Sequence, residues 1–247
     1  MSGHSHFSTI RRTKEGKDAA RGKIFSRHSK AILIAVKEGG NADPDMNSRL
    51  RFAIDQAKAD NMPKVNIDRL LDRASESGNI DEVVYEGFGP SGIMVIVEAA
   101  TDNRNRTAQE MKSLFDKNGG NMGSPGSVSF NFDPNGLLII RKEEDSEAQM
   151  LRLIDAGAED IVEEEDALEV FVSPDKLGVM HKTLTEAGFT IDRFELTRIP
   201  KTTQMIDGLE DAQKVMHFFD NFENHDDVQK VYANVGIPDE VLSKLNN

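Results

Sequence analysis

Several features that define common protein classes are missing from this chain. Its 247 residues include no cysteine, which excludes disulfides, thiolate zinc sites, iron–sulfur clusters and a cysteine nucleophile. Its apolar runs are only a few residues long, far short of the ~18 residues that a membrane-spanning helix needs. The first 30 residues are basic and contain no apolar core of a secretory signal. We therefore expect a cytoplasmic protein that has no contact with a membrane.

Charge is distributed unevenly along the chain. Residues 1–40 carry nine lysines and arginines and three acidic residues, a net charge of +6, whereas the rest of the chain has a net charge of −19. An acidic body repels phosphate backbones, so a protein of this kind contacts nucleic acid through one surface only. A solvated basic segment without a partner is the alternative interpretation. The candidate nucleic-acid-binding residues are Arg11, Arg12, Lys14, Lys17, Arg21, Lys23, Arg27 and Lys30.

Three of these basic residues have a helical spacing. Lys14, Lys17 and Arg21 are three and four positions apart, so a helix places them on one face. About six phosphate contacts give the logarithm of the affinity for duplex DNA a slope near −5 against the logarithm of the salt concentration. Nothing in the spacing specifies particular bases, so we expect contact with the phosphate backbone.

The N-terminal part of the chain predicts a small bundle of helices. Apolar side chains recur at helical intervals in three segments, Phe25–Val36, Leu50–Ala57 and Ile67–Ala74. Gly39-Gly40 ends the first helix, and Pro63 opens the third because proline fits the first turn of a helix.

The remaining sequence predicts two α/β domains. From Gly136 to Pro200 the elements follow the order β-α-β-β-α-β of the ferredoxin-like unit. Residues 79–135 lack a final helix and strand, and we expect the C-terminal tail to supply both. The fold class is then α+β, with one ferredoxin-like domain inserted in the other; three domains in chain order are the alternative. The expected boundaries are 1–78 for the helical domain, 79–135 plus 201–247 for the split domain, and 136–200 for the inserted domain.

Two strands of the split domain are predicted from short patterns. Val128, Phe130 and Phe132 alternate with polar residues, which predicts a strand whose phenylalanines pack in the core. A short strand at Thr202–Met205 is expected to precede the last long helix.

Two loops carry sequence patterns that occur at functional sites. Gly87-Phe88-Gly89-Pro90-Ser91-Gly92 matches GxGxxG, but it leads into the predicted strand Ile93–Ala99 instead of a helix, so we interpret it as a tight turn and not as a nucleotide site. Arg104, Asn105 and Arg106 lie at a strand-to-helix junction, where loops often carry function. Helix capping with a solvated turn is the alternative interpretation there.

Motifs that indicate catalysis are absent from the sequence. The histidines are scattered, and no nucleophile elbow, Ser-His-Asp order or metal-ligand spacing occurs. We therefore expect a protein that is not an enzyme and has no catalytic residues, no metal, no cofactor and no small-molecule substrate.

Several multi-residue blocks occur in order along the chain: Gly3-His4-Ser5, Arg21-Gly22-Lys23-Ile24-Phe25, Asn61-Met62-Pro63-Lys64, Tyr85-Glu86-Gly87-Phe88-Gly89-Pro90, Thr101 to Thr107, Gly119-Gly120-Asn121, Gly126-Ser127-Val128 and Asp226-Asp227-Val228-Gln229-Lys230-Val231-Tyr232. Together they resemble the YebC/PmpR family, whose mitochondrial relative is a translational activator of cytochrome oxidase subunit one. One departure lies near the start, where His6-Phe7 stands in place of the usual Lys-Trp pair.

The resemblance implies a helical N-terminal domain, two α/β domains of which one is inserted in the other, and a non-enzymatic regulator of gene expression in the cytoplasm. Members of the family are labelled probable transcriptional regulators, with DNA binding for some, and others are similar to translation factors that act on the ribosome. We expect a regulator that binds DNA through its basic N-terminal domain. A factor bound to ribosomal RNA is the first alternative, and a protein-interaction scaffold is the second.

Overall fold

The N-terminal part of the molecule is a helical unit. The structure is a computed structural model that describes residues 19–74 and 80–245. Residues 19–74 form α2 (Ala19–Gly39), α3 (Ser48–Ala59) and α4 (Lys64–Arg73). The side chain of Asn47 accepts a hydrogen bond from the backbone N–H of Leu50 and so caps α3. The predicted apolar stripes meet in one core, whose buried members are Ile32, Ala35, Leu50, Ala53, Ile54, Ala57, Met62 and Ile67.

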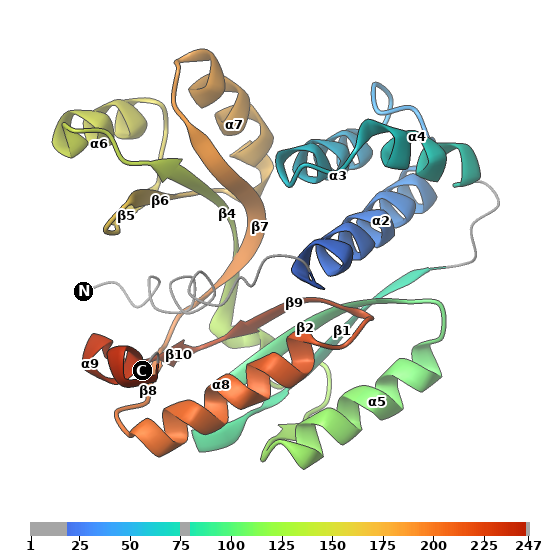
Figure 1. The fold of residues 1–247 in the computed structure, drawn as a ribbon, viewed down its shortest axis with the longest axis vertical. Helices are drawn as coiled ribbons and strands as arrows, with labels where there is room; N and C mark the ends of the chain where they lie inside the picture. The colour runs from blue at the N-terminus through green and yellow to red at the C-terminus, as the bar shows by residue number, and fades with distance from the viewer. Residues whose placement is uncertain (1–18, 75–79, 246–247) are drawn as a thin grey trace.

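The second unit is built from two separate parts of the chain. Its elements are β1 (Asp81–Phe88), β2 (Met94–Thr101), α5 (Arg104–Lys117) and β3 (Asn121–Met122), followed, after the inserted residues, by α8 (Leu209–Glu223) and β9 (Val228–Ala233). The sheet order is β3-β1-β2-β9, with antiparallel neighbours. α5 and α8 contribute to the apolar cluster on one face of this sheet and run side by side there (Figure 1). We call this part the split unit.

The third unit lies between the two halves of the split unit. It consists of β4 (Phe132–Arg141), α6 (Ser146–Asp155), β5 (Asp160–Glu163), β6 (Ala167–Val172), α7 (Leu177–Glu186) and β7 (Ile191–Pro200). The sheet order β5-β6-β4-β7 is antiparallel and ferredoxin-like. We call it the inserted unit. The expected boundary between residues 135 and 136 falls inside β4.

The predicted fold class is confirmed: an N-terminal three-helix domain precedes two ferredoxin-like α/β domains, one inserted in the other. The element order within the split unit differs from the prediction. β1, which we did not predict as a strand, comes first in the chain yet lies between β3 and β2, where the third strand of the ferredoxin-like order belongs. Gln204–Met205 forms β8, which pairs with β10 (Val235–Gly236) in a sheet of its own.

The strand predicted around Phe130 is wrong. Ser129–Asn131 forms a short 3-10 helix (η2), and the side chain of Phe130 is 63% exposed, whereas Phe132 is buried as predicted. The alternation is overridden because the carboxylate of Glu86 accepts backbone N–H groups from this segment, including that of Ser129, which a strand would use for its partner. The other short elements are η1 (Pro90–Gly92), η3 (Pro174–Lys176) and α9 (Asp239–Leu245).

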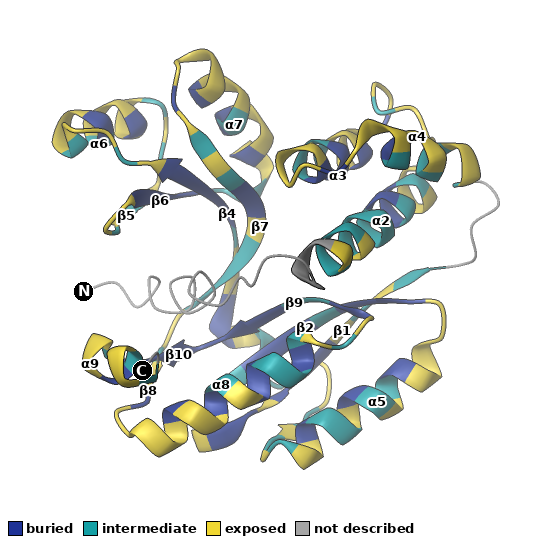
Figure 2. Ribbon diagram, in the orientation of Figure 1, coloured by how far each residue is buried: buried dark blue, intermediate teal, exposed yellow. Residues whose placement is uncertain are grey.

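The inserted unit contacts both other units through β7. Arg198 on β7 donates to the Oε1 of Glu98 on β2, with Nε and Nη2 at 3.0 and 2.9 Å. Nearer the start of β7, Phe194 meets the ring of Phe52 on α3 edge-on, with 5.3 Å between centroids. Figure 2 shows that the central strands β2, β4 and β6 are mostly buried, whereas the outer sides of the helices are exposed. Within the described ranges, no helix is long and apolar enough to cross a membrane.

Candidate nucleic-acid interface

The basic residues predicted on α2 face the split unit. Lys23, Arg27 and Lys30 are four and three positions apart, so they share one face of the helix. Arg27 donates from Nε to the carbonyl of Val228 at 3.2 Å and from Nη2 to the carbonyl of Glu223 at 3.0 Å. Lys23 reaches Asn224 Oδ1 at 3.2 Å. These contacts end at the last turn of α8 and the connection to β9, so this face of α2 holds two units together.

Lys30 makes the densest of these contacts. Its Nζ donates to the carbonyls of Ala100 and Asp226, at 3.0 and 2.9 Å, and to Asp227 Oδ1 at 2.8 Å. All three bonds available to an ammonium group are therefore made within the protein.

Asp227 is the centre at which three elements meet. Besides Lys30 of α2, its carboxylate accepts Arg106 Nη2 and Thr107 Oγ1 of α5 on Oδ2, both at 2.8 Å. Burial by itself raises the pKa of Asp227, but the hydrogen bonds from Lys30, Arg106 and Thr107 outweigh it and hold this pKa well below its usual range. The carboxylate is therefore ionised over the neutral pH range.

Arg104, Asn105 and Arg106, which the sequence placed in a loop, form the first turn of α5. Arg106 binds Asp227 and also Asp102 Oδ1 at 3.0 Å, and the hydrogen bond to Asp227 raises the pKa of this guanidinium. Arg104 Nε donates to Asp81 Oδ2 at 2.8 Å, and Asn105 is exposed. This first turn, capped by the side chain of Asn103, therefore joins α5 to β1 and to the turn before β9.

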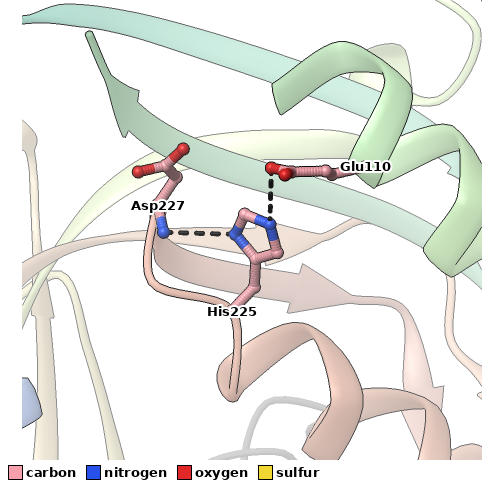
Figure 3. Close-up of side chains that lie close together, drawn as sticks. All are labelled: Glu110, His225 and Asp227. Carbon is pink, nitrogen blue, oxygen red and sulfur yellow. Dashed lines mark hydrogen bonds and ion pairs between the residues drawn. The ribbon is translucent and has the colours of Figure 1, made fainter. Parts of the chain in front are cut away.

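Glu110, His225 and Asp227 bring together atoms that are typical of metal ligands (Figure 3). His225 Nδ1 accepts the backbone N–H of Asp227 at 3.1 Å, so Nε2 carries the proton that points to Glu110 Oε2, also at 3.1 Å. Both ring nitrogens are thus occupied, and Asp227 already faces two cations. A divalent ion here would have to displace Arg106 and Lys30, so the donor set fits a hydrogen-bonded junction better than a metal site.

The side chains of the other predicted basic residues are not described by the structure. Arg11, Arg12, Lys14 and Lys17 are outside the described residues, and so is the side chain of Arg21. The sequence of residues 19–74 has a net charge of +4, compared with −10 for residues 132–200 and −8 for residues 80–131 and 201–245 together. Positive charge is therefore concentrated on the helical unit.

Asp227 and Glu86 were not singled out from the sequence. Glu86 is buried on β1 and accepts the backbone N–H groups of Gly126, Val128 and Ser129 at 2.8 to 2.9 Å. These bonds fix the loop that displays Phe130. Both acidic residues lie within blocks that carry the family resemblance, but periodicity and spacing alone give no signal for them.

The fold and this junction define a three-unit α+β protein with a positively charged helical unit on two acidic units. Residues 5–77 match the family model for the TACO1/YebC protein N-terminal domain, and residues 80–235 match the model for the TACO1/YebC second and third domain. The chain belongs to the TACO1/YebC family.

Relatives match over the full chain. A probable transcriptional regulatory protein of Dictyoglomus turgidum is 44% identical over 253 residues and covers 100% of both chains. A second protein of that description, from Geobacter sulfurreducens, is 44% identical over 248 residues, with 99% and 100% covered. The crystal structure of a conserved hypothetical protein, Aq1575 from Aquifex aeolicus, has a TM-score of 0.84 and 40% identity and covers 93% of this chain and 96% of that chain.

Proposed function

We propose that this protein is a non-enzymatic regulator of gene expression that binds nucleic acid through its helical unit and the basic segment before it. The observation that carries this proposal is the separation of charge between units. The helical unit is positive, with a net charge of +4 over residues 19–74, and the inserted and split units are acidic. A polyanion is attracted to the first and repelled by the other two, so it is oriented on the surface of the protein before any specific contact forms.

Duplex DNA is the first candidate target. Its support is the description of the relatives as probable transcriptional regulatory proteins. Direct contacts would come from Arg11, Arg12, Lys14, Lys17 and Arg21, because Lys23, Arg27 and Lys30 are engaged with the split unit. Such contacts are made to phosphates, and they bind many sequences with similar affinity.

Ribosomal RNA is the second candidate, and the position of α2 favours it. A helix that reads DNA lies in the major groove, but one face of α2 is covered by the end of α8. A large folded RNA offers phosphates to a surface of this kind without requiring a helix in a groove. This candidate predicts that the protein sediments with ribosomes.

A set of charge reversals tests the proposal. The variant with Arg11, Arg12, Lys14 and Lys17 changed to Glu is compared with a control in which Lys112 and Lys117, both exposed on α5, are changed to Glu. Binding to a labelled 30-bp duplex and to a ribosomal RNA fragment is measured between 50 and 200 mM salt. We expect the first variant to lose at least tenfold in affinity on the physiological target, with a shallower salt slope, and the control to bind nearly as the wild type does.

Sedimentation of lysates through sucrose gradients then separates the candidates. Wild-type protein that moves with ribosomes, and leaves them as salt rises, indicates the RNA target. Protein that stays in light fractions and binds the duplex indicates DNA. Equal binding by wild type and the four-residue variant on both probes contradicts the proposal and leaves a protein-interaction scaffold as the better account.

A further inference from the structure

The cations of α2 that contact the split unit form a single row. Lys23, Arg27, Lys30 and Lys37 lie at positions i, i+4, i+7 and i+14, which repeat on one side of an α-helix. Lys37 donates to Asp81 Oδ1 at 2.6 Å and to the carbonyl of Ile80 at 3.2 Å. At 1.5 Å per residue the row is about 21 Å long. A duplex carries one negative charge per ~1.7 Å of its axis, so a row of this length can face several phosphates.

The groups that occupy this row are carbonyl oxygens and the carboxylates of Asp227 and Asp81, all of them hydrogen-bond acceptors as phosphates are. Four of the acceptors are at the end of α8 or just after it: the carbonyls of Glu223, Asp226 and Val228 and the carboxylate of Asp227. The carbonyl end of a helix carries about half a negative charge. Burial and the neighbouring Arg27 lower the pKa of Lys23. The exposed carboxylate of Asp226 opposes this shift, so it adds negative charge beside the row.

The contact between α2 and the split unit depends on these polar bonds. Among the described residues, the apolar cluster of the helical unit and that of the split unit have no residue in common. The contact between the helical and inserted units is different, because Phe52 packs against the apolar cluster that contains Phe194. Polar interfaces between domains resemble transient ones, and their ion pairs weaken as salt rises.

We propose that the row Lys23, Arg27, Lys30 and Lys37 is a phosphate-binding face for nucleic acid. The split unit occupies it as an internal competitor, with the end of α8 and Asp227 on the first three cations and Asp81 on Lys37. Nucleic acid bound by the basic segment before α2 would then displace the split unit from this face of α2 and gain these four cations. This inference rests on the proposed function, because it adds a regulated second surface to the same nucleic-acid interface.

A covalent lock tests the inference on the full chain. The protein has no cysteine, so Lys23→Cys and Asn224→Cys create one reactive pair at a contact between α2 and the end of α8. A short bis-maleimide joins the pair, and the matched control is the same variant with both thiols capped by N-ethylmaleimide. Both forms lack the charge of Lys23. They differ in whether α2 can separate from the end of α8.

The affinities of both forms are measured for a labelled 30-bp duplex and a labelled 30-nucleotide RNA hairpin. We expect the linked form to bind the preferred probe at least tenfold more weakly than the capped form, with a shallower salt slope. Asp227→Asn provides an independent test, since it removes the charge of the competitor. We expect it to bind about threefold more tightly than wild type, provided that its circular dichroism spectrum is that of the wild type.

The outcomes separate this inference from the proposed function. Equal binding by linked and capped forms, with wild-type protein binding normally, overturns the inference and leaves the proposed function in place. No binding of either probe by wild type, capped form or Asp227→Asn overturns both. Weaker binding by the linked form alone supports the inference even if Asp227→Asn does not fold.

Discussion

Lys30 and Asp227 are 197 positions apart in the chain, and the Nζ of the lysine lies 2.8 Å from Oδ1 of the aspartate. This ion pair joins the first described helix to the turn before β9 of the split unit. The side chain of Asp227 is only 9% exposed, and that of Lys30 is 20% exposed. Because the pair is largely removed from water, its partners depend on one another more than the partners of a surface pair do.

Asp227→Ala should destabilise the protein by about 2–3 kcal/mol. The substitution leaves the ammonium of Lys30 and the guanidinium of Arg106 without their shared carboxylate, and removing one partner of a buried pair is costly. The free energy of unfolding in urea measures the effect. The control is Asp226→Ala, because the neighbouring side chain is exposed; an equal loss in the two variants would contradict the role assigned to Asp227.

Glu86→Gln should loosen the loop that carries Phe130. A carboxylate accepts the N–H groups of Gly126, Val128 and Ser129, whereas one half of a glutamine amide is a donor and opposes them. Loss of these hydrogen bonds should cost the loop about 1–3 kcal/mol of stability. Hydrogen exchange of the three amides should therefore become roughly 10 to 100 times faster. Glu82→Gln, an exposed change on the same strand, should leave their exchange rates unchanged.

Acid should weaken the fold through the same two carboxylates. Burial raises the pKa of Glu86, but the backbone hydrogen bonds from Gly126, Val128 and Ser129 lower it more, and the pKa of Asp227 is also lowered. A depressed pKa contributes stability that is present above the unfolded value, near 4, and is lost as pH falls through the folded value. The free energy of unfolding should therefore fall as pH goes from 6 to 3.

The variants Asp227→Asn and Glu86→Gln provide the check on this pH dependence. Each removes one carboxylate that must be protonated in acid, so each should show a flatter profile than wild type over the same pH range. A variant profile parallel to that of wild type would mean that other groups cause the acid sensitivity.

Gly120→Ala and Gly178→Ala should change stability in opposite directions. A Cβ at residue 120 would lie 2.5 Å from the carbonyl oxygen of Phe88 and 3.0 Å from the ring of Phe218, so the loop or β1 must shift. We expect a loss of about 2 kcal/mol. Gly178 lies in α7 with open space around it, and alanine there should gain about 0.5–1 kcal/mol. Thermal melting of both variants tests the pair, and equal melting temperatures would contradict it.

Local patterns in the sequence predicted most of the elements. The apolar stripes of α2, α3 and α4, and the strand and helix order of the inserted unit, follow from short-range periodicity and caps that each segment carries within itself. The need for a final helix and strand in the split unit also came from counting elements, and α8 and β9 supply them.

The segment around Phe130 shows where local patterns fail. Its alternation is typical of a strand, but Glu86, more than 40 residues earlier, takes its amides as hydrogen-bond donors. β1 was missed because its residues alternate weakly, and its place between β3 and β2 depends on pairing with segments on both sides.

The sequence by itself determined the helices, the α/β units and the concentration of positive charge at the N-terminal end, because these depend on neighbouring residues and on composition. Only the tertiary structure decided what the cations of α2 contact. Lys23, Arg27 and Lys30 have the composition of a phosphate-binding face, yet in the folded chain they donate to groups about 200 residues away. Pairing over such a distance depends on how three units pack, and no local spacing encodes it.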